Sequence, residues 1–440
     1  MEMKLELKKH LLMQKKKTGI LWGLLLVISF LLQGSVLPIN DTSIFNRSLL
    51  ATSPLSVQLV NCPAWGRCAE KPKLTFSLPV GTGVSSGISI HVRIGAAERT
   101  FQGWSFTVEL PLTTKDGLQV TYWTSNALGQ ASEKRSFFMR CLLTDGVGGK
   151  YLVELLGKQW EAEAPGCAAV WNTFPDLASE GYGWQQRLED PLQLQTQYKF
   201  PLLAGRLIWN GLVDASSCSN KGLLPNGSAD ACGQDLAKTS VERWQNENNA
   251  AILQAALPAL IPARLLKGLI AQESQFWPHW EKKDEYGLGM LTDMGVDMAL
   301  QWNFGFYYNK CTSFYSEQYC SQGYQYLSST AKKFLRGRLL SEIGTTAEYR
   351  LLAETLYAGC LQSAQLVRNI AKKEPRDVAS YEDMWRITLG VYHAGCGCIH
   401  DAMQQAWKTN KNFYWANVNR HLSGVCQGAG DYFDRIIRLS

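Results

Sequence analysis

The hydrophobic pattern of this chain changes partway along its length, from a period of two to a helical period. Between residues 56 and 142, apolar side chains alternate with other residues in several stretches, for example from Ile88 to Ile94. Such alternation predicts half-buried β-strands. From residue 246 to the end the pattern becomes helical, and Gly and Pro separate the segments. A chain of 440 residues with both patterns is expected to form a multidomain α+β protein.

The strand-forming part, residues 56–142, is predicted to be an all-β sandwich because turn residues separate its strands at sandwich spacing. Its stretch from Gly117 to Gly129 resembles the late hairpin of bacterial Ig-like modules. The resemblance implies an Ig-like module that acts as a spacer or contacts carbohydrate. Residues 143–245 are rich in Trp, Gly and Asn and have weak periodicity, so we expect an irregular, disulfide-braced connector there. Residues 246–440 form the expected helical domain.

A lysine-rich segment precedes an apolar run near the N-terminus. Residues 1–17 hold six lysines and two glutamates, and the run from Ile20 to Leu32 has no charged residue. Lysines stay on the cytoplasmic side of a membrane, so residues 18–39 are predicted to be a single-pass anchor that leaves the rest of the chain outside the cytoplasm. A cleaved signal peptide, which would give a secreted protein, is the alternative. Residues 40–55 are predicted to be a linker.

Charge and cysteine content narrow the classes of function. Most of the net charge of +6 lies in the basic N-terminal segment, and no basic stripe follows it, so no nucleic-acid partner is expected. All twelve cysteines lie beyond residue 60, which favours an oxidising compartment outside the cytoplasm. Three pairs are near enough in sequence to close short loops: Cys62 and Cys68, Cys218 and Cys232, Cys311 and Cys320. Residues 396–400 (CGCIH) have no second ligand pair at zinc-finger spacing, so no metal or other cofactor is expected.

One glutamate lies on the apolar face of a predicted helix. Pro262 and Pro278 bracket a helix over residues 263–277. Glu273 follows Leu269 by four residues and Ile270 by three, so it lies on the same stripe. A carboxyl group on an apolar face is costly to ionise, and its pKa is expected to rise. Such a group suits general acid catalysis near neutral pH.

Three short segments follow one another in a family-like order: Glu273-Ser274-Gln275-Phe276, then residues 287–292 (GLGMLT), then residues 391–395 (VYHAG). In this order they resemble the soluble lytic transglycosylase (SLT) family, which has a lysozyme-like helical fold. The resemblance covers about residues 262–406. It implies a peptidoglycan lytic transglycosylase that cleaves the MurNAc-GlcNAc β-1,4 bond and leaves a 1,6-anhydro product.

The resemblance also assigns roles to individual residues. Glu273 matches the single catalytic acid/base, and Tyr392 matches the tyrosine that lies near this glutamate and supports it. The residues implied to contact the substrate are Ser274, Gly289, Met290, Leu291, Thr292 and His393. Thr292 stands where the family has Gln, and His393 where it has Asn, so substrate preference can differ. Ser274 has a second interpretation, as a simple hydrogen bond at the helix end.

Two alternatives remain open. A lysozyme-type hydrolase would use a second carboxylate, for which the candidates are Asp284, Glu285, Asp293 and Asp297. A catalytically inactive glycan-binding scaffold of a cell-envelope assembly is the other. In each case the expected partners are peptidoglycan glycan strands, together with the membrane through the N-terminal anchor.

Overall fold

The computed structural model describes residues 55–60, 62, 65–78, 87–114, 116–143, 150–156, 166–174, 183–185, 188, 190–278 and 284–440. The predicted basic segment and anchor, and all of the predicted linker except Leu55, lie outside these residues. Among the residues described, no helix combines the length and the apolar character needed to cross a bilayer.

The β region consists of two antiparallel sheets. The smaller has the order β1 (Ser56–Val60), β3 (Lys73–Ser77) and β6 (Ser105–Glu109). The larger has the order β2 (Trp65–Cys68), β9 (Tyr151–Leu156), β8 (Arg135–Leu143), β7 (Leu118–Ser125), β4 (Ser89–Ile94) and β5 (Ala97–Gln102). The predicted β region is therefore confirmed.

Alternate residues of both sheets meet in one core, as the period of two predicts. Leu74 and Phe76 of β3 and Ile90 and Val92 of β4 are buried together. The register pairs Val92 with Tyr122 and thereby places inward residues opposite one another. β9 pairs with β8, so the β region continues past the predicted boundary at residue 142.

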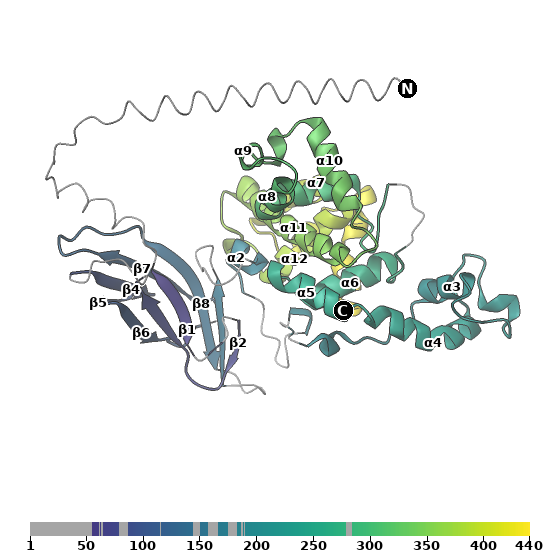
Figure 1. The fold of residues 1–440 in the computed structure, drawn as a ribbon, viewed down its shortest axis with the longest axis horizontal. Helices are drawn as coiled ribbons and strands as arrows, with labels where there is room; N and C mark the ends of the chain where they lie inside the picture. Colours follow the sequence, from purple (N-terminus) through teal and green to yellow (C-terminus); the bar gives the residue numbers. More distant parts are fainter. Residues whose placement is uncertain are drawn as a thin grey trace, which may run out of the picture. The chain divides into compact units, whose positions relative to one another are not determined.

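The helical region follows the β region and has the following elements in order: α2 (Cys167–Trp171), α3 (Pro201–Trp209), α4 (Ala231–Asn246), α5 (Asn249–Ala259), α6 (Ala263–Ser274), α7 (Asp293–Trp302), α8 (Phe304–Thr312), α9 (Glu317–Cys320), α10 (Ser329–Leu340), α11 (Ala347–Ala371), α12 (Tyr381–Ala394), α13 (Cys396–Asn410), α14 (Trp415–Asn419) and α15 (Tyr432–Arg438). Figure 1 shows α11 and α12 in the middle of this region, with α7, α8 and α10 on one side and α5 and α6 on the other. α11 packs against α5, α7 and α12.

The segment predicted as an irregular connector contains helices that the hydrophobic pattern did not indicate. α4 is sixteen residues long, but the residues that it buries are Gly233, Ala237, Val241 and Gln245. Small and polar residues give a weak apolar stripe, which explains the missed helix. The Cys218–Cys232 disulfide braces this part of the chain, as expected.

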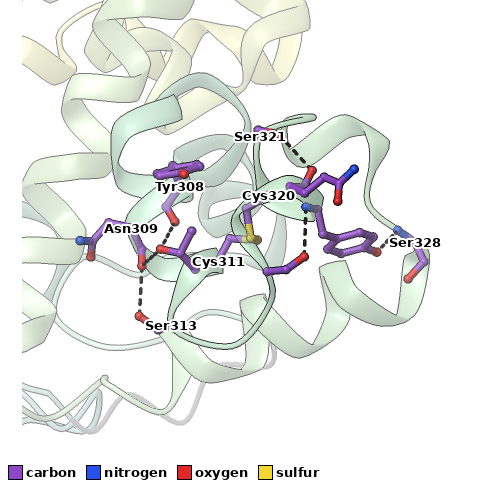
Figure 2. Close-up of a disulfide and its surroundings, with 11 residues drawn as sticks. Tyr308, Asn309, Cys311, Ser313, Cys320, Ser321 and Ser328 are labelled. Carbon is purple, nitrogen blue, oxygen red and sulfur yellow. Dashed lines mark hydrogen bonds between the residues drawn. A yellow bond between two sulfur atoms is a disulfide. The ribbon is translucent and has the colours of Figure 1, made fainter. Parts of the chain in front are cut away.

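The described residues contain five disulfides. The three short-range pairs suggested by the sequence are all bonded. Figure 2 shows one of them, Cys311–Cys320, which joins the end of α8 to α9. Two further bonds, Cys167–Cys360 and Cys398–Cys426, link segments that are distant in sequence. Cys398 is thus bonded to sulfur, and within the described ranges no cluster of His, Cys, Asp and Glu is arranged to hold a metal ion.

A buried lysine ties the connector to the helix that carries Glu273. Lys267 of α6 is fully buried and donates hydrogen bonds to the carbonyl oxygen of Leu194 and to the side-chain oxygens of Asn246 and Asn249, at 2.6–2.8 Å. Burial lowers the pKa of Lys267 to about 7, while the three oxygens stabilise its charged form. One side chain therefore joins three segments around α6.

Replacing Lys267 should destabilise the fold. In Lys267→Met the three buried oxygens lose their common donor, and we expect a loss of about 2–4 kcal/mol in the free energy of unfolding. Urea unfolding followed by circular dichroism measures it. The exposed Lys238→Met is the matched control and should remain within about 0.5 kcal/mol of wild type. Equal stability of the two variants would contradict a structural role for the Lys267 contacts.

Candidate functional site

Glu273 lies in the last turn of α6 and is half-buried. The hydroxyl of Tyr432, the first residue of α15, donates a hydrogen bond to its Oε1. α15 can approach α6 this closely because residue 268 is glycine: a Cβ there would lie 2.4 Å from the carbonyl oxygen of Ile436. The hydrogen bond between Tyr432 and Glu273 joins residues 159 positions apart, and no local pattern in the sequence indicates it.

The helix ends earlier than the predicted residue 277. Gln275 and Phe276 have φ values of 48° and 63°, so the chain turns sharply immediately after Ser274. The turn is held by the side chain of Gln275, which accepts hydrogen bonds from the backbone N–H groups of Leu202 and Leu203. The C-terminal end of α6, which carries Glu273, is therefore held by contacts from α3 and from α15.

Tyr392 connects α12 to the glycine-containing loop. Its hydroxyl donates to the carbonyl oxygen of Gly289 at 2.5 Å. Burial raises the pKa of Tyr392 well above its usual value, and the negative charges of Glu273 and Glu348 raise it further. Tyr392 thus lies near enough to Glu273 for the charge of that carboxylate to act on its hydroxyl, but the tyrosine that donates to Glu273 is Tyr432.

The loop from Tyr286 to Leu291 closes on itself through two backbone hydrogen bonds between these residues, at 2.8 and 2.9 Å. A Cβ at Gly289 would lie 2.2 Å from Leu352 of α11 and 2.8 Å from the Tyr392 hydroxyl. The resemblance placed Gly289 at the substrate. In the structure, close packing against α11 and α12 already requires it.

Glu348, at the start of α11, binds the backbone of the same loop. It is 1% exposed, and its carboxylate accepts hydrogen bonds from the backbone N–H groups of Leu288 and Gly344. A side chain at Gly287 would collide with it, since a Cβ there would lie 2.2 Å from its Oε1. Burial raises the pKa of Glu348, and the two backbone hydrogen bonds oppose this rise. Sequence reasoning did not identify this residue.

Ser274, Leu291 and Thr292, which the resemblance placed at the substrate, have structural contacts. Ser274 is 0% exposed and its hydroxyl donates to the carbonyl oxygen of Ile270, which matches the second interpretation. Leu291 belongs to the core, whereas Met290 beside it is half-buried at a φ of 50°. Thr292 caps α7, because its hydroxyl oxygen accepts from the N–H of Gly295 at 3.1 Å.

His393 is exposed and stacks on the ring of Tyr432, with centroids 4.2 Å apart and an interplanar angle of 14°. Partial burial of its ring, together with the nearby Arg435, lowers the pKa of His393, and Asp431 opposes this shift. A neutral imidazole at neutral pH is the consequence. His393 therefore touches the residue that donates to Glu273.

Two of the candidate second carboxylates are engaged elsewhere. Asp297 accepts hydrogen bonds from the Tyr324 hydroxyl at 2.5 Å and from Arg336 at 2.9 Å. Asp293 lies 3.4 Å from the same guanidinium. These contacts join α7 to α10.

Comparison with known proteins adds no relatives. No protein-family model matches the chain, and neither a curated protein nor a solved structure is significantly similar to it.

The buried carboxyl of Glu348 predicts a pH-dependent stability. A raised pKa means that the folded state binds more protons than the unfolded state above the ordinary carboxyl value of 4.5. The free energy of unfolding of the wild type should therefore fall, relative to Glu348→Gln, as pH rises from 4.5 through the raised pKa. Urea midpoints of both proteins across this range measure the difference. A difference that is constant with pH would contradict the assignment.

Proposed function

We propose that this chain is a peptidoglycan lytic transglycosylase with a lysozyme-like catalytic domain, and that Glu273 is its only catalytic acid/base. One observation carries the proposal. Residues from all three family-like segments, together with Tyr432, gather around one half-buried carboxyl group at a fixed helix end. This convergence at the residue that matches the family's catalytic acid/base supports the proposal.

The proposed reaction uses this carboxyl group twice. Glu273 protonates the oxygen between N-acetylmuramic acid and N-acetylglucosamine, and the bond to the muramoyl anomeric carbon breaks. The resulting carboxylate then accepts the proton of the muramoyl 6-hydroxyl, whose oxygen closes on the same carbon. The Tyr432 hydroxyl, bonded to Oε1, orients the carboxyl group through both steps.

A single-carboxylate mechanism fits the surroundings better than a two-carboxylate one. Asp293 and Asp297 neutralise Arg336, and Glu348 is occupied by backbone N–H groups. A hydrolase needs a second carboxylate or a carboxylate-activated water near the anomeric carbon. Because two of the four candidate carboxylates are engaged with Arg336, the surroundings support the anhydro product over a reducing end.

The proposed location is outside the cytoplasm, held at the membrane by residues 18–39. Five disulfides support an oxidising compartment. In this proposal the β region acts as an Ig-like spacer.

Digestion of purified peptidoglycan tests the proposal. The full chain in mild detergent should release muropeptides lighter by one water than hydrolysed ones, as read by mass spectrometry. Glu273→Gln keeps the size of the side chain and an acceptor for Tyr432 but carries no acidic proton. Its rate should fall about 100- to 10,000-fold. Water-added products would indicate a hydrolase, and glycan binding without any products would indicate an inactive scaffold.

Tyr432→Phe isolates the contribution of the orienting hydrogen bond. The ring that stacks on His393 remains, while the donor to Glu273 is lost. We expect the turnover rate to fall roughly 10- to 100-fold, the effect of removing a hydrogen bond to a charged group. Steady-state digestion rates measure it, with the exposed Tyr326→Phe as control. Wild-type turnover in Tyr432→Phe would rule out the orienting role.

A further inference from the structure

The ring of Tyr432, whose hydroxyl donates to Glu273, is contacted by a histidine and an arginine. The imidazole of His393 on α12 stacks on this ring, and the guanidinium carbon of Arg435 lies 5.7 Å from its centroid. Tyr432 is 1% exposed and belongs to the core of the helical region. A phenol is rigid, so the place of its ring determines where its hydroxyl lies relative to the carboxyl group of Glu273.

Arg435 lies on the same helix as Tyr432. It forms an ion pair with Asp431 and donates a hydrogen bond to the carbonyl oxygen of Gly428 at 3.2 Å. Gly428 belongs to the short helix η6 (Gly424–Ala429), which precedes α15. These contacts order the start of α15, but they do not fix the tyrosine relative to α6 or α12.

His393 is the contact that comes from a different element. It follows Tyr392 on α12, and the hydroxyl of Tyr392 bonds to the glycine-containing loop. The imidazole also lies against η6, since a Cβ at Gly428 would be only 3.3 Å from its Nε2. The Cys398–Cys426 disulfide ties η6 to α13. The imidazole thus links the ring on α15 to α12 and to η6.

The contact between the two rings is that of a flat, uncharged pair. Burial and the nearby Arg435 lower the pKa of His393, against the opposing effect of Asp431, so the imidazole is neutral at neutral pH. It faces the phenol of Tyr432 at an interplanar angle of 14°. Such a stack depends on the shape of the ring more than on its nitrogen atoms. A hydrocarbon ring can therefore replace the imidazole, whereas the asparagine of the SLT pattern has no ring.

We propose that His393 is a positioning residue of the candidate site, whose ring, stacked on Tyr432, holds the phenol hydroxyl on Oε1 of Glu273; this rests on the proposed function. His393 then acts through Tyr432 and not, as the resemblance implied, by contact with the substrate. The two roles have different requirements at residue 393. A sugar contact requires a polar group, and the stack requires a flat ring.

Two replacements of His393 separate these roles. His393→Asn keeps a polar group and restores the residue of the SLT pattern, whereas His393→Phe keeps a flat ring. In digestion of peptidoglycan by the full chain, His393→Asn should lower kcat about three- to tenfold with KM unchanged, the effect of losing one aromatic stack. His393→Phe should stay within about twofold of wild type. Wild-type activity of His393→Asn would overturn the proposal, and a raised KM in His393→Phe would assign the residue to the sugar.

His421→Asn is the matched control. This half-buried histidine lies between α14 and η6. The same replacement there should leave kcat at the wild-type value. An equal loss in His421→Asn and His393→Asn would show a general effect of the replacement and would overturn the proposal.

A double-mutant cycle tests whether His393 acts through the hydroxyl of Tyr432. In Tyr432→Phe the ring remains but the hydroxyl is absent, so adding His393→Asn should cost less than about twofold in kcat. A loss of stability from the missing stack would persist in both backgrounds, and melting temperatures measure it. The same loss of kcat in both backgrounds would therefore show a merely structural effect and overturn the positioning role.

A spectroscopic readout does not depend on cleavage. With carbon-13 at the tyrosine ζ-carbons, the NMR signal of Tyr432 is the one missing in Tyr432→Phe. Because the hydroxyl donates to Glu273, this signal should follow the ionisation of that carboxyl group as pH changes. We expect His393→Phe to keep the pH-dependent change and His393→Asn to reduce it by about half or more, because a hydrogen bond weakens as its geometry departs from the optimum.

The positioning role and the proposed function can therefore fail separately. If wild type cleaves no glycan while the NMR signal still depends on the ring at residue 393, the proposed function fails and the positioning role stands. If wild type cleaves glycan and the two His393 variants give the same pH-dependent change, the reverse holds.

Discussion

Two turns of α11 fix the loop that lies beside Glu273. Glu348 accepts one hydrogen bond from the N–H of Leu288 in this loop and another from the N–H of Gly344, and Leu352, one turn later, leaves no space for a side chain at Gly289. Tyr392 then bonds to the Gly289 carbonyl from the neighbouring helix. A buried carboxylate is costly unless its oxygens are satisfied, so the loop and α11 stabilise each other. The position of Tyr392, and with it the arrangement around Glu273, depends on this contact.

Thr292 and His393, the two departures from the SLT pattern that the sequence resembles, have local physical explanations. Threonine is a good N-cap because its short hydroxyl reaches the N–H two or three residues ahead, and Thr292 makes this contact with Gly295. The longer glutamine of the family is a poor cap. His393 presents a flat ring to Tyr432, which asparagine cannot do. Both replacements therefore contribute to holding the elements around Glu273.

Much of the fold could be predicted from the sequence, because periodicity is a local property. The alternation at Leu74 and Phe76 and the apolar stripe at Leu269 and Ile270 correspond to buried residues. The short-range disulfides were suggested by spacing alone. The site was predicted less accurately than the fold: Ser274, which the resemblance placed at the substrate, is buried.

Tyr432 and Glu348 could not be identified from the sequence, because their roles come from contacts across 159 and 60 residues. Such contacts depend on how helices pack against one another, and no pattern along the sequence indicates them. The close approach of α15 to α6 at Gly268 is one example.

The Cys167–Cys360 bond has a mechanical consequence. It joins the segment after the β region directly to α11, across 193 residues. A force applied between the β region and the C-terminal helices would pass through this covalent link, so the intervening residues 168–359, α6 among them, would not be extended while the bond is intact.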